Sequence, residues 1–105
     1  MHRGEIWWAE LPKPSGRRPV LILTRDEAVR VREAVTITEL TTNIRRIATE
    51  VHFKKEDGLP KECVANLDVI NTIPKELLKE FIATVDDIKL EAIEKALKFA
   101  LDLNK

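Results

Sequence analysis

Two pairs of side chains in this sequence could bind and activate a phosphate group. Arg17 and Arg18 stand directly before Pro19 and an apolar run, and Thr41 and Thr42 close a strand-like segment. A guanidinium carries a permanent charge and a planar fork of donors that matches phosphate. A threonine hydroxyl can hold a non-bridging oxygen. Without a metal, these groups could assist attack of a ribose 2′-hydroxyl on its neighbouring phosphate by stabilising charge on the phosphorane.

A simpler interpretation of these residues stays open. Arginines before a strand are usually solvated surface charges. Spacing alone does not show that Arg18 and Thr41 meet in space. On residue types alone, solvated arginines are the favoured interpretation.

Other catalytic chemistry has less support in the sequence. His2 and His52 are far apart and have no paired-carboxylate or zinc-motif context, which argues against a metal site. Cys63 has no electropositive neighbours that would activate a thiolate. Asp68 stands between apolar residues of a predicted strand, so it should have a partner, either an arginine or a loop amide.

Composition bounds the class of protein. At 105 residues, 44% hydrophobic and 34% charged, the chain should form one domain, residues 1–105. It has no apolar run long enough to span a membrane and no signal peptide, and its single cysteine excludes an internal disulfide. These features favour a cytoplasmic protein. The formal net charge is zero, yet every arginine lies within the first 46 residues. A local basic groove would exist if the fold joined residues 17–18 to residues 45–46.

The first half of the chain reads as strands around short loops. Residues 4–11 predict a strand in which Trp7 and Trp8 point to opposite faces, one of them to the core and the other to an interface or surface. Residues 12–16 form a loop, and a second strand begins at Pro19 and is buried on both faces. Residues 26–33 are weakly helical. Residues 34–40 alternate apolar and polar side chains, as a half-buried strand does.

The second half predicts three more strands and one clear helix. The strands cover residues 47–53, 63–72 and 80–85, with a turn at 54–61 and a helical turn at 74–79. Asp86 and Asp87 should cap a helix whose apolar stripe, from Ile88 to Leu101, faces the core. The pattern indicates a small, curled antiparallel sheet with a C-terminal helix packed on it.

Five motifs, in order, resemble the MazF/PemK (Kid) family of toxins from toxin–antitoxin modules. They begin with an RGEIW strand at residues 3–7 and a G-x-R-P segment at 16–19. A strand ending in Thr-Thr at 41–42, a T-E-V strand with a following Gly-Leu-Pro turn, and an L-D…T-I segment at 67–73 complete the series. Each motif is moderately specific, and the ordered series is far more so.

The resemblance implies a fold, an activity and partners. It implies an SH3-like β-barrel with a C-terminal helix, forming a homodimer with an RNA groove. It also implies sequence-specific cleavage of single-stranded RNA that needs no metal or cofactor and leaves a 2′,3′-cyclic phosphate and a 5′-hydroxyl. A cognate antitoxin would cover the groove with an acidic segment.

The resemblance also assigns site residues. Arg18 and Thr41 take the positions of the family's catalytic arginine and threonine. The residues expected to bind RNA are Arg17, Thr42, Asn43 and Asp68.

The chain departs from the family pattern at three places. The loop at residues 12–16 is short and lacks a Gly-x-Glu-Gln element, and Asn66 and Asn71 stand where family members carry arginine. Two alternatives therefore remain open. One is a non-enzymatic toxin of the same fold, of the gyrase-inhibiting CcdB type, although the chain lacks that type's C-terminal Trp. The other is an inactive family member that only binds an antitoxin.

Overall fold

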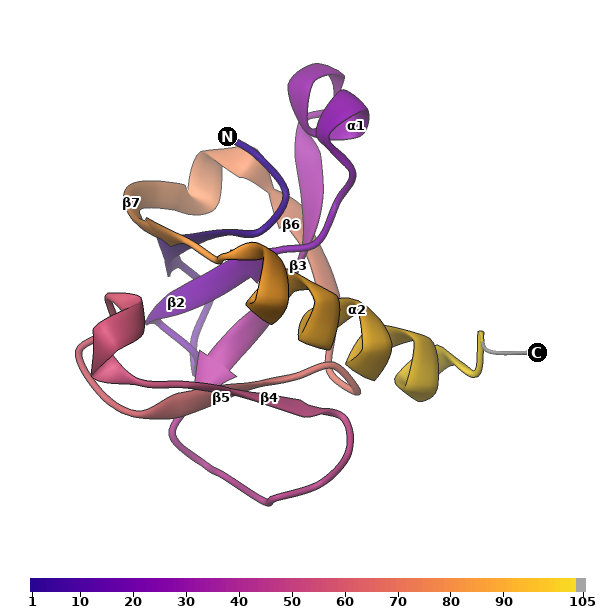
Figure 1. The fold of residues 1–105 in the computed structure, drawn as a ribbon. Coiled ribbons are helices and arrows are strands. Elements are labelled where there is room, and N and C mark those ends of the chain that lie inside the picture. Colours follow the sequence, from indigo (N-terminus) through magenta and orange to yellow (C-terminus); the bar gives the residue numbers. More distant parts are fainter. Residues whose placement is uncertain (104–105) are drawn as a thin grey trace.

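The computed structural model describes residues 1–103 and consists mainly of a curled antiparallel sheet with a C-terminal helix (Figure 1). The strands follow the order β4-β5-β3-β2-β1-β7, and β6 also pairs with β3. The sheet is not closed, but it is barrel-like, so the predicted fold class is confirmed. The elements are β1 (Glu5–Glu10), β2 (Arg17–Ile22), α1 (Asp26–Val31), β3 (Ala34–Thr41), β4 (Glu50–Phe53), η1 (Lys55–Asp57), β5 (Cys63–Asn66), β6 (Asn71–Pro74), η2 (Lys75–Leu77), β7 (Leu78–Thr84) and α2 (Asp87–Leu101).

The strand β2 is the centre of the fold because both of its faces are buried, as its unbroken apolar run predicts. Leu21 belongs to an apolar cluster that also contains Ile93 and Ala96 of α2. Val20 and Ile22 point the other way, into a second cluster that includes Val29 of α1. Figure 1 shows α2 crossing in front of the sheet, with α1 at one end of the molecule and the β3–β4 loop at the other.

The two arginines lie inside β2, not in the loop before it. Glu10 of β1 pairs with Arg17, and Ala9 pairs with Arg18. Pro19 is tolerated at the third position of the strand for a geometric reason. The N–H of Leu23 donates to Thr36 O of β3 (2.9 Å). Backbone N–H groups alternate between the two edges of a strand, so the nitrogen of Pro19, four residues earlier, points to the same edge, toward β3. The paired residues of β2 and β3 begin only at Val20, so no ladder hydrogen bond is lost there.

The single strand predicted for residues 63–72 is wrong, because it is two strands separated by a turn. The edge of β3 that faces away from β2 pairs with β6 over its first half and with β5 at its end. The chain leaves the sheet between these two pairings. Thr38, 1% exposed, lies at the gap, and its hydroxyl is 3.2 Å from Asn66 O and 2.9 Å from Val69 O. This buried hydroxyl therefore ties the turn to β3.

Other boundaries differ by a few residues. The fourth strand begins at Glu50, three residues after the predicted start, because residues 44–49 follow a loop that folds onto the side chain of Glu50. The last strand begins at Leu78, two residues before its predicted start, and pairs with β1. Its central partners are Trp7 and Trp8.

Helix α2 begins as predicted, but its apolar stripe is only partly core. The side chain of Asp86 accepts the N–H of Lys89 at 2.7 Å, as a helix N-cap does. Ile93 and Ala96 are buried, whereas Ile88 is 83% and Leu101 is 50% exposed. Figure 1 shows the C-terminal part of α2 extending past the strands, so the sheet covers only the middle of the helix. No helix within residues 1–103 combines the length and the apolar character needed to cross a membrane.

Candidate functional site

The β1–β2 hairpin holds Arg18 by its inner nitrogen. The hairpin closes where Leu11 N donates to Gly16 O at 2.9 Å, and Gly16 has a φ of +67° that suits glycine. Arg18 Nε donates to the carbonyl oxygen of Ser15 at 3.1 Å. Within residues 1–103, no hydrogen bond or ion pair occupies its two terminal nitrogens. The guanidinium is therefore oriented by the loop while the donors that suit phosphate stay available.

A small cavity adjoins Arg18. Its volume is about 200 Å³, and Thr42 is a second predicted site residue in its wall. The other lining residues come from β1, β2, β3, the segment before β5 and the first residue of β5. They are Trp8, Pro19, Leu40, Leu59, Pro60, Lys61 and Cys63. The cavity wall is thus largely apolar, and Arg18 and Lys61 are the basic residues that line it.

Thr41 does not line this cavity, and no hydrogen bond within residues 1–103 joins it to Arg18. Val20 pairs with Glu39 and Leu21 with Thr38. Extending this register by two residues would put Arg18 opposite Thr41, beyond the last paired residues of the two strands. The hydroxyl oxygen of Thr41 accepts the N–H of Asn43 at 3.1 Å, which leaves the hydroxyl proton free to be donated. Asn43 itself is exposed.

Arg17 lies on the opposite face of β2, over an aromatic ring. Its guanidinium carbon is 4.9 Å from the centre of the Trp8 ring, and its Nη2 is 3.0 Å from Glu80 Oε1. Both partners of this ion pair are exposed, so the pair contributes little to stability. Arg17 can exchange Glu80 for a phosphate at small cost.

The second arginine pair is held by its backbone. The carboxylate of Glu50 accepts N–H groups from Arg45 (2.9 Å) and Arg46 (2.7 Å). Desolvation raises the pKa of Glu50, but the N–H donors of Arg45, Arg46 and Ile47 outweigh it, and the pKa is lowered overall. Across the described chain, no hydrogen bond or ion pair joins residues 45–46 to residues 17–18. The two arginine pairs therefore do not form the joint basic groove that the sequence left as a condition. The basic residue that shares the cavity with Arg18 is Lys61.

Asp68 has a partner, although not of the predicted kind. Its Oδ2 accepts the hydroxyl of Thr49 at 2.9 Å, and its N–H donates to Asn66 Oδ1 at 3.0 Å. Thr49 is 4% exposed. The expected partner, an arginine or a loop amide, is replaced by this buried hydroxyl. Asp68 lies in the β5–β6 turn and does not line the cavity beside Arg18.

The remaining nucleophile and metal candidates are unsuited to their chemistry. Burial, with the nearby charges of Asp57 and Glu62, raises the pKa of the Cys63 thiol to about 11. The thiol is therefore protonated at neutral pH and is a poor nucleophile. No group of three or more His, Cys, Asp or Glu side chains within residues 1–103 is arranged to hold a metal ion.

Sequence reasoning missed most of the cavity wall. Trp8 could be recognised as an aromatic for a surface or interface, but nothing local showed which tryptophan would reach Arg18. Leu59 and Pro60 belong to the Gly-Leu-Pro turn, so the motif pointed to them without indicating a role. No signal in the sequence singled out Lys61.

Comparison with known proteins shows extensive similarity. Residues 2–101 match the family described as PemK-like, MazF-like toxin of type II toxin–antitoxin system. The probable endoribonuclease MazF5 of Mycobacterium tuberculosis is 37% identical over 105 residues, covering 98% of this chain and 94% of that protein.

Solved structures agree with the sequence match. The Mycobacterium tuberculosis toxin MazF-mt6 has a TM-score of 0.88 and 34% identity, covering 96% of this chain and 99% of that one. A mycobacterial endoribonuclease in complex with its cognate antitoxin has a TM-score of 0.89 and 28% identity, covering 100% and 98%. The family match spans nearly all described residues and a relative above 30% identity covers them too. The resemblance predicted from the motifs is therefore confirmed, and the chain belongs to the PemK-like, MazF-like toxin family of type II toxin–antitoxin systems.

Proposed function

We propose that this chain is the endoribonuclease toxin of a toxin–antitoxin pair and that it cleaves single-stranded RNA without a metal. Its relatives include a probable endoribonuclease and an endoribonuclease bound to an antitoxin. The observation that carries the proposal is the hydrogen bonding of the Arg18 guanidinium. Its Nε is held by the Ser15 carbonyl, its terminal nitrogens carry no hydrogen bond or ion pair within residues 1–103, and the residue lines a cavity together with Thr42.

The proposed reaction is a transesterification within the RNA. The 2′-oxygen attacks the neighbouring phosphorus, the bond from phosphorus to the 5′-oxygen breaks, and the products are a 2′,3′-cyclic phosphate and a 5′-hydroxyl. One proton leaves the 2′-hydroxyl and one reaches the leaving oxygen, so the step needs no co-reactant. Arg18 stabilises the charge that grows on the phosphorane oxygens. Thr41 donates a hydrogen bond from its hydroxyl to a non-bridging oxygen.

The remaining candidate residues bind or support the RNA strand. Arg17 is exposed next to the cavity and supplies a second phosphate contact. Thr42 lines the cavity, and Asn43 is exposed just after it. Asp68 is assigned a supporting role in the β5–β6 turn through its bond to Thr49.

Two protein partners belong to the proposal. A cognate antitoxin would block the RNA site with an acidic segment, since the arginines beside the cavity favour negative charge. A second copy of the chain would form a homodimer. Large apolar side chains exposed on α2, Ile88 (83%) and Phe99 (62%), offer contact surface for association. The proposed place of action is the cytoplasm, where messenger RNA is translated.

The test is cleavage of a long RNA of mixed sequence by the purified protein in EDTA, with both fragment ends mapped. We expect discrete cuts with 5′-hydroxyl ends. Arg18→Ala should lower the rate by roughly 10²-fold or more, the usual effect of removing one donor to a developing oxyanion. Arg18→Lys should rescue little, because lysine lacks the planar fork.

Arg30→Ala is the matched control. Arg30 is exposed on α1 and lies outside the cavity beside Arg18, so its loss should leave cleavage unchanged. Each variant should be checked for the same melting temperature as the parent. Full cleavage by Arg18→Ala would refute the role of Arg18. An absence of cleavage by the folded parent protein would favour an inactive family member that only binds an antitoxin.

A further inference from the structure

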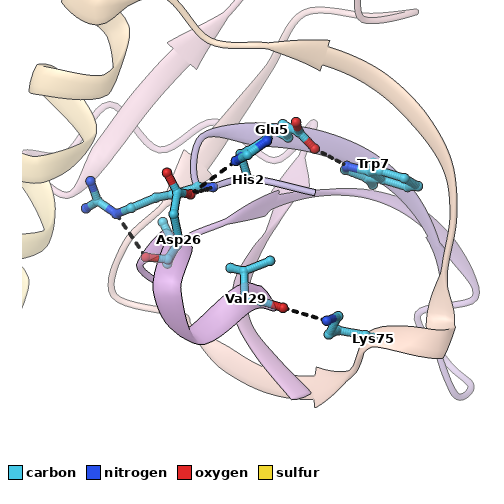
Figure 2. A network of polar contacts seen from close by, with 8 residues as sticks. His2, Glu5, Trp7, Asp26, Val29 and Lys75 are labelled. Atoms are coloured by element: carbon cyan, nitrogen blue, oxygen red, sulfur yellow. Dashed lines mark hydrogen bonds and ion pairs between the residues drawn. The ribbon is translucent and has the colours of Figure 1, made fainter. Parts of the chain in front are cut away.

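The two adjacent tryptophans have different surroundings. Trp7 packs beside the apolar cluster under α1. Its Nε1 donates to Glu5 Oε1 at 2.9 Å (Figure 2), and its ring meets Phe81 edge-on at 5.9 Å between centroids. These contacts are those of a structural tryptophan. Trp8 points to the other face of the hairpin, is half-buried and lines the cavity beside Arg18.

The N-terminal segment keeps the Trp7 side of the hairpin occupied by protein. Arg3 N donates to Asp26 Oδ1 at 2.7 Å, and Lys75 Nζ donates to Val29 O (Figure 2). These contacts fasten α1 over that face. Trp8 lies on the hairpin face that also carries Ile6 and Leu21, which α2 covers farther along the strands. Around Trp8 itself lies the cavity, bounded by the hairpin, by Leu40 and Thr42, and by residues 59–63.

The surroundings of Trp8 combine aromatic, apolar and cationic groups. The guanidinium of Arg17 lies 4.9 Å from its ring centre. Pro19 and Pro60 supply apolar wall, and Lys61 adds a further charge. Successive bases of a single strand stack on aromatic rings while cations follow the phosphates, and this is the common design of single-strand binding sites.

The size of the cavity limits what can enter it. Its volume is about 200 Å³, whereas pockets for drug-sized ligands range from about 300 to 1,000 Å³. A single planar base suits this space, with its ribose and phosphates left outside. The phosphates would then lie at the rim, where Arg17 and Arg18 stand.

We propose that the cavity walled by Trp8, Pro60 and Lys61 holds one unpaired base of the RNA, stacked on Trp8. Arg17 and Arg18 bind the phosphates on either side of that base. This inference rests on the proposed function, which it deepens by naming Trp8 as the residue that holds a base of the RNA beside Arg18. Stacking accepts every base, so selectivity arises from the edges that Thr42 and Lys61 present.

The first experiment uses tryptophan fluorescence. Trp7→Phe leaves Trp8 as the only tryptophan, and Trp8→Phe leaves Trp7. Each variant is titrated with a single-stranded deoxy-oligonucleotide of mixed sequence, which lacks the attacking 2′-hydroxyl, and with an abasic strand of equal length. We expect the base-containing strand to quench Trp8 emission and to leave Trp7 emission unchanged. The abasic strand should bind through its phosphates without quenching.

The second experiment measures affinity for the same two strands by anisotropy. Trp8→Ala should weaken binding of the base-containing strand by roughly 5- to 150-fold, the range known for one base on one aromatic ring. It should leave binding of the abasic strand unchanged. If Trp8→Ala does not fold, the affinity of Trp8→Leu for the two strands and the fluorescence comparison test the stacking site instead.

The outcomes separate this inference from the proposed function. Equal quenching by both strands, or none by either when both bind, would overturn the stacking site even if RNA is cleaved normally. Selective quenching of Trp8 by a protein that fails to cut RNA would support the base site and refute the nuclease. In an active protein, Trp8→Leu should also raise the KM for RNA cleavage, whereas an unchanged KM would contradict a role of Trp8 in holding the base.

Discussion

The turn between β5 and β6 should depend on one buried hydroxyl. Thr38→Val keeps the shape of the side chain and removes the group that lies 2.9 Å from Val69 O and 3.2 Å from Asn66 O. A lost hydrogen bond costs about 1 kcal/mol net, and an unsatisfied buried partner adds about 1–3 kcal/mol. Val69 is exposed and Asn66 is half-buried, so water can partly replace the hydroxyl. We therefore expect a loss of about 1–2 kcal/mol in the free energy of unfolding.

The assay is thermal and urea unfolding followed by tryptophan emission. For a chain of this size, the loss corresponds to a decrease of roughly 4–16 °C in melting temperature. Protein concentration must be equal in all samples, because self-association would stabilise the folded state.

Thr36→Val is the matched control for this prediction. Thr36 occupies the same face of β3 two residues earlier, and its hydroxyl meets only the exposed hydroxyl of Thr72, at 2.8 Å. The same chemical change should alter stability there by no more than about 0.5 kcal/mol. If the two variants unfold alike, the buried hydroxyl does not hold the turn and the reasoning is refuted.

Three further predictions concern titration and capping. The lowered pKa of Glu50 means that its contribution to stability is present above its unfolded pKa and is lost as pH falls through the folded value. The protection of the amides of residues 45–46 against exchange, taken relative to their intrinsic rates at each pH, should therefore fall in acid, and Glu50→Gln should remove that pH dependence; unchanged protection would contradict the assignment. Burial raises the pKa of Cys63 to about 11, so the stability it contributes is full below about 9 and is lost as pH rises through 11. Its thiol should react with a disulfide reagent at pH 8 far more slowly than in urea, and equal rates would disprove its burial. Asp86→Ala removes the 2.7 Å cap of α2 and should cost about 1 kcal/mol in unfolding free energy, whereas Asp86→Ser should restore most of it.

The local pattern of the sequence determined much of the fold. The unbroken apolar run at Val20–Leu23 predicted a strand buried on both faces, and the two apolar clusters confirm it. Alternation at Val35 and Ile37 predicted β3, and Asp86 predicted the start of α2. These features depend on side chains one to four residues apart, so the sequence displays them directly.

The ends of strands were less predictable because they depend on a distant partner. Residues 63–72 have strand-forming composition throughout, yet they pair with β3 at two separate places and leave the sheet between them. Arg17 and Arg18 are in β2 because Glu10 and Ala9 pair with them. Neither pairing can be predicted from the residues close by in the sequence.

The candidate site shows the same division. The sequence by itself predicted Arg18, Thr41 and Thr42 as site residues through residue type and motif order. Only the tertiary structure decided that Arg18 is held through Nε, that Thr42 shares its cavity, and that Trp8 and Lys61 complete the wall. The cavity draws on residues from 8 to 63, and they meet because the register of four strands sets which residues face one another. That register follows from packing across the whole sheet, which no short stretch of sequence contains.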